Sequence, residues 1–470
     1  MKKFLIFTLS LALILLITML HNGSSQALDA NLDKIDSELN DLISSGFNTA
    51  EVVITFHEST QDDRISLLKK LGLETAVVFE ELPLAGAIVT EELLFNVIEH
   101  EKIRGIFYNQ ELEYDNYSAT EQTGVNAVRT SSDFQKENDG FPITGNGVGV
   151  VVNDSGVDGT HDDHKLGNNL VQNVAGQLNL NSISGILPIF HLEDVPNTDT
   201  SSGHGTHVSG TVGGTGAKSG GKYEGVAPGA NIVGYGSGAA IAMLDILGGF
   251  EYALVNQQRY NIRVITNSWG STGDAGNPFN PEDPINIATK KLYDRGILTV
   301  FSAGNSGPEE GTISGNYKKA PWVVTVAAAE RDQTLTNFSS RGVENGGGTA
   351  VVDGEEWEWV DRPTVTSPGR LIISTRVIGT LSALSAANDI EHIEPGYLPY
   401  YATMSGTSMA APHVAGVAAL IFEANPSLNP LEVKEIIETT ATEMEGYEDW
   451  EVGGGFINAY DAVEEAMNDK

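Results

Sequence analysis

Four short apolar runs between residues 148 and 301 constrain the fold more than any other feature of this sequence. Stretches with helical spacing separate them, and each run ends in a turn of glycine and small polar residues. The runs are Val148–Val152, Asn231–Val233, Arg263–Thr266 and Ile297–Phe301. Apolar strands that alternate with helices predict an α/β fold, in which a mostly parallel sheet has helices on both faces. Ligands bind at the carboxyl ends of such strands, so we expect the functional residues in the turns.

Polar groups gather in these turns and at the start of two helices. The turns contain Asp154-Ser155-Gly156, Gly236-Ser237-Gly238, Ser268-Trp269-Gly270 and Gly304-Asn305-Ser306. The two helical segments, rich in Ala and Gly, begin near His204 and Ser408. A helix N-terminus presents free N–H groups and the positive end of the helix dipole. A serine at this place is therefore suited to chemistry in which negative charge develops.

These motifs resemble those of the subtilases, the subtilisin-like serine proteases, over residues 122–463. The segments Asp-Ser-Gly, His-Gly-Thr-His-Val, Ala-Gly-Asn and Gly-Thr-Ser-Met-Ala-Ala-Pro occur in the family's order. The resemblance implies the subtilisin-like three-layer fold and the activity of a serine endopeptidase. It also implies that Asp154 orients an imidazole, that His204 is the general base and then acid, and that Ser408 is the nucleophile. Asn305 matches the side-chain donor of the oxyanion hole.

Each of these residues alone has a commoner explanation, such as a turn former, an interior histidine or a helix cap. Their joint occurrence in this order favours catalysis. The pairs His161/His164 and His204/His207 also fit a metal hydrolase, but no His-Glu-x-x-His is present and the triad accounts for one pair. We therefore assign no metal ligand, and we expect His207 and His413 to pack structurally.

The resemblance further implies where substrate binds. An extended peptide would add as a strand between two edge segments through main-chain hydrogen bonds. The predicted substrate-binding residues are Gly236, Ser237, Gly238, Ser268, Trp269 and Gly270. Trp269 predicts an aromatic wall for an apolar pocket.

We expect catalysis to need no cofactor, while a structural calcium ion is an open alternative. Asp163 matches a calcium ligand of some subtilases, but residues 214–221 lack the ligand-rich sequence that those proteins use.

Residues 1–27 predict a signal peptide, and therefore a secreted protein. Lys2 and Lys3 precede the uncharged run 4–20, and small residues at Ser25 and Ala27 fit cleavage after Ala27. An uncleaved membrane anchor is the alternative, because 17 residues lie at the short limit for spanning a bilayer.

Residues 28–119 predict a small ferredoxin-like α+β domain. The expected βαββαβ order comprises strands at 51–56, 76–79, 84–89 and 103–108 and helices at 62–71 and 91–99. The resemblance implies that this domain is a propeptide, an intramolecular inhibitor and folding assistant. Residues 120–470 would then be the peptidase domain of a zymogen, with self-cleavage in the irregular stretch 109–122.

Charge and composition exclude several classes. The net charge of −36 would repel nucleic acids and anionic lipids, and a chain without cysteine has no thiol nucleophile or disulfide. The acidity reads as a solvated surface or as adaptation to high salt. We expect a monomer that binds polypeptide substrates and its own propeptide. A catalytically silent binding protein on the same scaffold is the alternative function.

Two segments look inserted relative to compact subtilases. In the first, 342–362, Thr349–Val352 and Glu355–Val360 flank Asp353-Gly354, which predicts a hairpin whose Trp357 and Trp359 face packs. The second spans residues 377–399.

Overall fold

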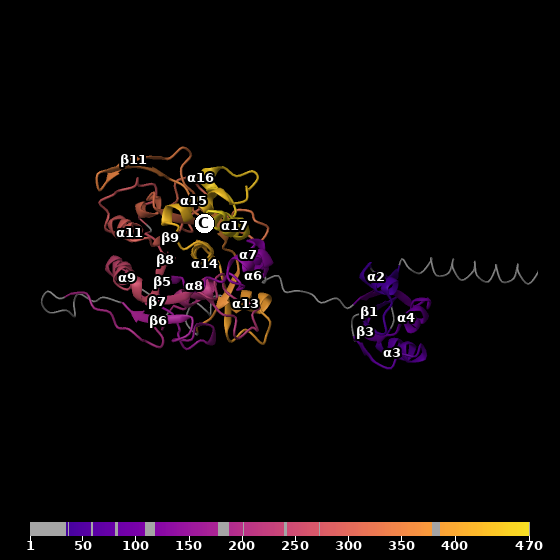
Figure 1. Cartoon of the computed structure of the whole chain (residues 1–470). Helices are drawn as coiled ribbons and strands as arrows, with labels where there is room; N and C mark the ends of the chain where they lie inside the picture. Colours follow the sequence, from indigo (N-terminus) through magenta and orange to yellow (C-terminus); the bar gives the residue numbers. More distant parts are fainter. Residues whose placement is uncertain are drawn as a thin grey trace, which may run out of the picture. The chain divides into compact units, whose positions relative to one another are not determined.

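The computed structural model divides the chain into two compact units, residues 1–113 and 114–470 (Figure 1). It describes residues 34–35, 37–57, 60–79, 83–108, 118–176, 188–200, 202–238, 242–271, 273–377 and 386–469. The predicted signal peptide, most of the predicted cleavage stretch and part of the second insertion lie outside these residues. The two units meet in sequence within the stretch that was predicted to be cut.

The smaller unit has the predicted βαββαβ order. Its elements are β1 (Ala50–Phe56), α3 (Gln61–Lys70), β2 (Ala76–Val78), β3 (Leu84–Val89), α4 (Glu91–Ile98) and β4 (Ile103–Tyr108), preceded by α2 (Ser37–Ser45). The four strands form one antiparallel sheet in the order β2-β3-β1-β4. Every second residue of β1 is buried, and Ile54 packs in one core with Leu94 and Val97. The unit thus has a hydrophobic core of its own.

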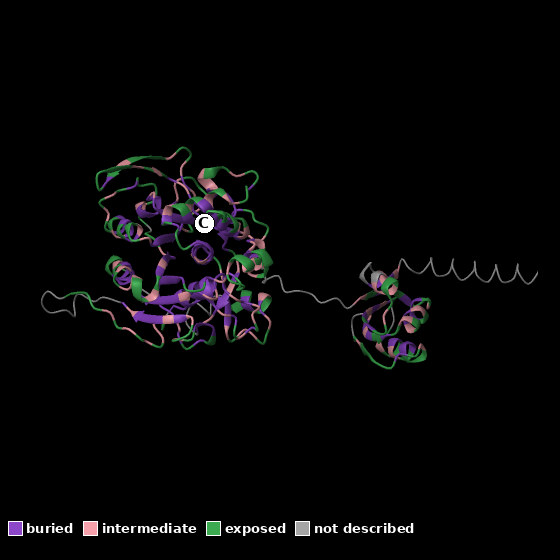
Figure 2. Ribbon diagram, viewed as in Figure 1, coloured by how far each residue is buried: buried purple, intermediate pink, exposed green. Residues whose placement is uncertain are grey.

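The larger unit is built on a parallel sheet, as predicted. Seven strands lie in the order β13-β10-β9-β8-β5-β7-β6, and all neighbouring pairs are parallel. They are β5 (Gly149–Asp154), β6 (Leu170–Ala175), β7 (Asn231–Gly236), β8 (Ile262–Asn267), β9 (Leu298–Ser302), β10 (Val323–Ala329) and β13 (Val365–Pro368). Most of their residues are buried (Figure 2). The four runs singled out in the sequence correspond to β5, β7, β8 and β9, which are adjacent in the sheet.

Helices cover both faces of this sheet, which gives the expected three layers (Figure 1). Val150 and Val152 of β5 share a core with α8 (His204–Gly213) and α14 (Thr407–Ala424). Val151 points the other way, into a core with α9 (Met243–Val255) and α11 (Pro284–Asp294). In the described part of the chain, α14 is the helix long and apolar enough to cross a membrane, but 89% of it is buried in the protein.

The remaining elements pack around these layers or extend from them. They are α5 (Ser118–Gln122), α6 (Val125–Thr130), α7 (Ser132–Glu137), η2 (Asp162–His164), α10 (Gln257–Tyr260), η4 (Asn316–Lys319), β11 (Gly347–Val352), β12 (Glu355–Val360), β14 (Ile372–Thr375), α13 (Ala386–His392), β15 (Tyr401–Met404), α15 (Pro430–Thr439), α16 (Asp449–Val452) and α17 (Ala459–Asn468).

The hairpin predicted in the first insertion is confirmed. β11 pairs with β12 in antiparallel register, and Asp353 and Gly354 both have positive φ, as a tight two-residue turn requires. The ring of Trp357 packs edge-on against Trp322, and Trp359 packs near Phe279. The hairpin therefore adds an aromatic layer to the core beneath β9 and α11.

Candidate active site

A hydrogen bond joins Asp154, the last residue of β5, to His204, the first residue of α8. The distance between Asp154 Oδ1 and His204 Nδ1 is 2.7 Å. A carboxylate accepts, so Nδ1 carries the proton and Nε2 is left free to act as a base. Asp154 is 1% exposed, whereas the His204 side chain is 24% exposed. Burial opposes protonation of His204, but the Asp154 charge and hydrogen bond outweigh it, and the pKa of His204 is raised.

Asp199 fixes the start of the His204 helix, a role that the sequence reasoning missed. Its Oδ1 accepts hydrogen bonds from the Gly203 N–H at 2.8 Å and the Ser155 hydroxyl at 3.2 Å. Its Oδ2 accepts from the N–H and the hydroxyl of Thr206, at 3.0 and 2.8 Å. The buried carboxylate thus ties the turn after β5 to the first turn of α8. Its position five residues before His204, where an acid can cap a helix, was the available signal.

Ser408 lies in the first turn of α14, which packs against α8. Its Oγ donates to the carbonyl of Ser268 at 3.1 Å, and the Ser268 hydroxyl donates back to the Ser408 carbonyl at 2.9 Å. The candidate nucleophile is therefore held against the end of β8, in the segment predicted to bind substrate. Contacts between a catalytic hydroxyl and its base often form only when substrate is bound.

Asn305 and the start of α14 together form a pair of free donors. Asn305 Oδ1 accepts hydrogen bonds from the Thr407 N–H at 2.9 Å and the Thr407 hydroxyl at 3.0 Å, which leaves Nδ2 as the free end of the amide. A Cβ placed on Gly406 would lie 3.2 Å from Asn305 Nδ2 and 3.6 Å from Ser408 N. Both nitrogens therefore border the space beside Gly406. A glycine with φ of 154° keeps this space open, which suits an oxyanion hole.

The segment 236–238 lies beside Asp154. Ser237 N donates to the Asp154 carbonyl at 2.8 Å, and Gly238 has φ of 79°, a conformation that favours glycine. Trp269, in the other segment, is anchored in the core, since its Nε1 donates to the Asn153 carbonyl at 2.9 Å and its ring packs against Phe301. Only the exposed part of Trp269 is left to border a pocket. Substrate binding by these segments stays a prediction.

Comparison with known proteins identifies the family. The model of the subtilase family matches residues 145–456. The chain is 32% identical to the serine protease AprX of Bacillus subtilis (strain 168), over 82% of this chain and 80% of that protein. It is 30% identical to a subtilisin of Bacillus sp. (strain TA39), over 85% of this chain and 83% of the relative. The chain belongs to the subtilase family. By class it is a serine endopeptidase, as its motifs predicted.

Solved structures agree with the fold of this subtilase. A psychrophilic protease, S41, superimposes with a TM-score of 0.51 at 27% identity, covering 71% of this chain and 97% of that one. Sphericase gives the same TM-score and the same coverage at 26% identity. The subtilisin-like fold class predicted from the strand and motif order is confirmed.

The other histidines of this subtilase have structural contacts. His207 Nε2 lies 3.0 Å from the Ile372 carbonyl and 3.1 Å from the Ala402 carbonyl, so it donates to both. His413 Nε2 lies 2.8 Å from the Thr123 hydroxyl. Burial lowers the pKa of both histidines to about 3, so they are neutral at physiological pH. In the residues that the structure describes, no group of three or more His, Cys, Asp or Glu side chains could hold a metal ion.

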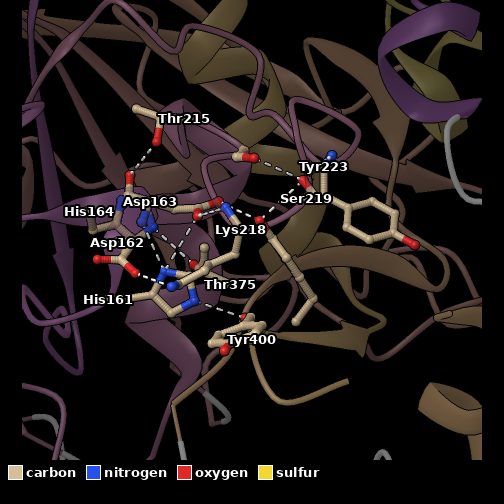
Figure 3. Close-up of polar contacts among 12 residues, drawn as sticks. His161, Asp162, Asp163, His164, Thr215, Lys218, Ser219, Tyr223, Thr375 and Tyr400 are labelled. Atoms are coloured by element: carbon tan, nitrogen blue, oxygen red, sulfur yellow. Dashed lines mark hydrogen bonds and ion pairs between the residues drawn. The ribbon is translucent and has the colours of Figure 1, made fainter. Parts of the chain in front are cut away.

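The surroundings of Asp163 do not fit a calcium ion (Figure 3). Asp163 is fully buried, and donors already bind both oxygens of its carboxylate: the Lys218 N–H at 3.1 Å and the Tyr401 hydroxyl at 2.8 Å. The Lys218 ammonium also pairs with the neighbouring Asp162. Calcium needs six to eight oxygen ligands, whereas these groups present hydrogens and a positive charge to the carboxylate. Structural calcium elsewhere in this subtilase stays a prediction.

Proposed function

We propose that this subtilase is a secreted endopeptidase, made as a zymogen, that hydrolyses peptide bonds through Asp154, His204 and Ser408 and an acyl-enzyme intermediate. The observation that carries the proposal is the pair of free donors, Asn305 Nδ2 and Ser408 N, beside the hydroxyl of Ser408. A scaffold that had kept only a binding role would have no need for two donors that point into one small space.

In the proposed mechanism, Ser408 Oγ attacks the carbonyl carbon of the scissile bond while His204 Nε2 takes the hydroxyl proton. The negative charge that develops on the carbonyl oxygen is held by Asn305 Nδ2 and Ser408 N. The C–N bond then breaks, and the imidazolium of His204 gives its proton to the leaving amine. Water repeats the sequence on the ester, which releases the acid and restores Ser408.

Asp154 holds the proton-bearing Nδ1 of His204 and stabilises the imidazolium that forms in each half of the reaction. The raised pKa of His204 suits this role, because it makes the imidazole a stronger base. Protein groups alone supply the base, the nucleophile and the oxyanion donors in this scheme. We accordingly propose that catalysis needs no cofactor.

The zymogen part of the proposal assigns residues 28–119 to an intramolecular inhibitor that leaves after self-cleavage. Its separate core, with Leu39, Val52 and Ile106 buried, supports a unit that folds apart from the peptidase unit. The uncharged run 4–20 behind Lys2 and Lys3 supports secretion. The proposed partners are polypeptide substrates and this propeptide, with a monomeric enzyme.

The test combines labelling and processing. The protein is expressed with its signal peptide, and the culture medium is assayed for casein hydrolysis and for the N-terminal sequence of the product. A fluorophosphonate probe is expected to label Ser408 in the wild type and nothing in Ser408→Ala. A folded wild-type protein that neither reacts with the probe nor hydrolyses casein would instead support the catalytically silent scaffold.

A further inference from the structure

A buried lysine lies close to the candidate active site without an anion to pair with. Lys318, in η4, is 3% exposed. Its ammonium donates one hydrogen bond, to the Ala303 carbonyl at a long 3.4 Å, in the contacts of the described residues. An ammonium group has three donors, and leaving it buried without a negative partner is costly. Its neighbour Lys319 is different, because it pairs with Asp361 at 2.7 Å.

The ammonium of Lys318 lies between the turns that follow β8 and β9. A Cβ placed on Gly270 would come within 2.5 Å of Lys318 Nζ, so the ammonium occupies the space where a side chain at position 270 would go. Gly270 itself is exposed, and Ala303 is two residues before Asn305. The two turns that enclose this charge are therefore those that hold Ser408, through Ser268, and the oxyanion donor.

The next step rests on the proposed function. We call the substrate residue whose carbonyl Ser408 attacks the acyl residue. When its carbonyl carbon meets Ser408 Oγ and its oxygen faces Asn305 Nδ2, its side chain starts only two bonds from the attacked carbon. The substrate backbone would lie along Ser268–Gly270, so this side chain projects between that segment and residues 303–305. The ammonium of Lys318 lies along this direction.

We infer that Lys318 sets the specificity of the enzyme for the acyl residue, and that it favours side chains with an acceptor oxygen at their end, glutamate first and glutamine second. A carboxylate would give the buried ammonium the charge-assisted hydrogen bond that it lacks. An aliphatic side chain would leave the charge unpaired, and a substrate lysine or arginine would be repelled.

Two further features are consistent with a cation that awaits a ligand. Burial lowers the pKa of Lys318 to about 8, while the charge of Asp274 opposes this shift, so the group is largely protonated at neutral pH. The Asp274 carboxylate does not pair with the ammonium. Its Oδ1 accepts the Gly315 N–H at 2.8 Å instead.

The experiment measures kcat/KM of the mature enzyme on four peptides that are identical except for Glu, Gln, Leu or Lys as the acyl residue. We expect Glu to exceed Leu by about 10-fold to 100-fold, the range that a charge-assisted hydrogen bond supplies, with Lys the poorest. In Lys318→Met, which keeps the length but not the charge, the ratio of Glu to Leu should fall to one or below.

Lys434→Met is the matched control. Lys434 is also a lysine whose pKa burial lowers to about 8, but its ammonium donates to the Pro321 carbonyl, outside both turns. This variant should keep the wild-type order of the four peptides. Should Lys318→Met fail to fold, the wild-type order alone decides: Leu or Lys cleaved as well as Glu would overturn the inference. A wild type that the fluorophosphonate labels but that ranks Leu first refutes the role of Lys318 alone, whereas an unlabelled wild type refutes the proposed function with it.

Discussion

The side-chain oxygen of Asn305 accepts both the backbone N–H and the hydroxyl of Thr407, at 2.9 and 3.0 Å. Thr407 immediately precedes Ser408, so the residue beside the nucleophile also orients the amide that would stabilise the oxyanion. The Thr407 hydroxyl in turn accepts the Gly304 N–H at 3.1 Å, which links the turn after β9 to the start of α14. The oxyanion donor is thus held on two sides before substrate binds.

Replacing Asn305 by alanine should lower kcat by about 10²-fold to 10³-fold with little change in KM, because the lost hydrogen bond forms mainly in the transition state. Thr407→Val should have a smaller effect of the same kind, because the backbone N–H still holds Oδ1, and Thr407→Ser should stay nearer to wild type. Steady-state kinetics on one peptide substrate measure all three. An unchanged kcat in Asn305→Ala would mean that another group stabilises the oxyanion.

Asp199→Asn tests whether the carboxylate that caps α8 also tunes His204. After burial and the contribution of Asp154, the charge of Asp199 adds to the raised pKa of His204. The general base must be neutral, so kcat/KM should rise with pH through this pKa. The asparagine keeps the shape but removes the charge, so the acid limb of the profile should move to lower pH and kcat should fall because the helix start is less well fixed.

A purely structural role for Asp199 would lower kcat or stability but leave the acid limb in place, which distinguishes the two explanations. Asp332→Asn serves as a control, because Asp332 is exposed in a turn and bonds only with Thr334. It should leave both the profile and kcat as in the wild type.

Local sequence patterns were enough to predict the strand ends and the hairpin turn. The apolar run before Asp154 and the pair Asp353-Gly354 each specify their conformation through neighbouring residues. The environments of Asp199, Lys318 and Tyr401 could not be read in this way, because each is completed by segments far away in the chain. Lys318, for example, is next to Lys319 in sequence, yet one faces Gly270 and the other pairs with Asp361. Only the packed fold separates their roles.

Removing the hydroxyl of Tyr401 should destabilise the enzyme. This buried group donates to Asp163 at 2.8 Å and lies 3.2 Å from the Ser219 hydroxyl, so Tyr401→Phe leaves a buried carboxylate with one donor fewer. We expect a loss of about 1–3 kcal/mol in the free energy of unfolding. Chemical denaturation measures it, with Tyr400→Phe as the control, because the Tyr400 ring lies against Lys218 rather than Asp163.

The same cluster predicts the response to chelators. Because protons rather than a cation occupy the carboxylate of Asp163, EDTA should not add to the destabilisation of Tyr401→Phe. A Tm that falls equally in the wild type and the variant would point to a calcium site elsewhere. A fall in Tm that the variant abolishes would mean that calcium does bind at Asp163.

Maturation provides the last test, since it joins the nucleophile to the boundary between the two units. The stretch 109–122 follows the last strand of the smaller unit, and within it Tyr114 and Tyr117 are the bulkiest residues that could enter a specificity pocket. If the enzyme cuts itself there, wild type should accumulate as a chain that begins within residues 115–123. Ser408→Ala removes one partly exposed hydroxyl from a helix start, so folding should survive. This variant should then be secreted as an uncut chain that begins near Leu28. N-terminal sequencing distinguishes the two products in a host without other extracellular proteases, and maturation of the alanine variant at the same bond would show that Ser408 is not the group that cuts.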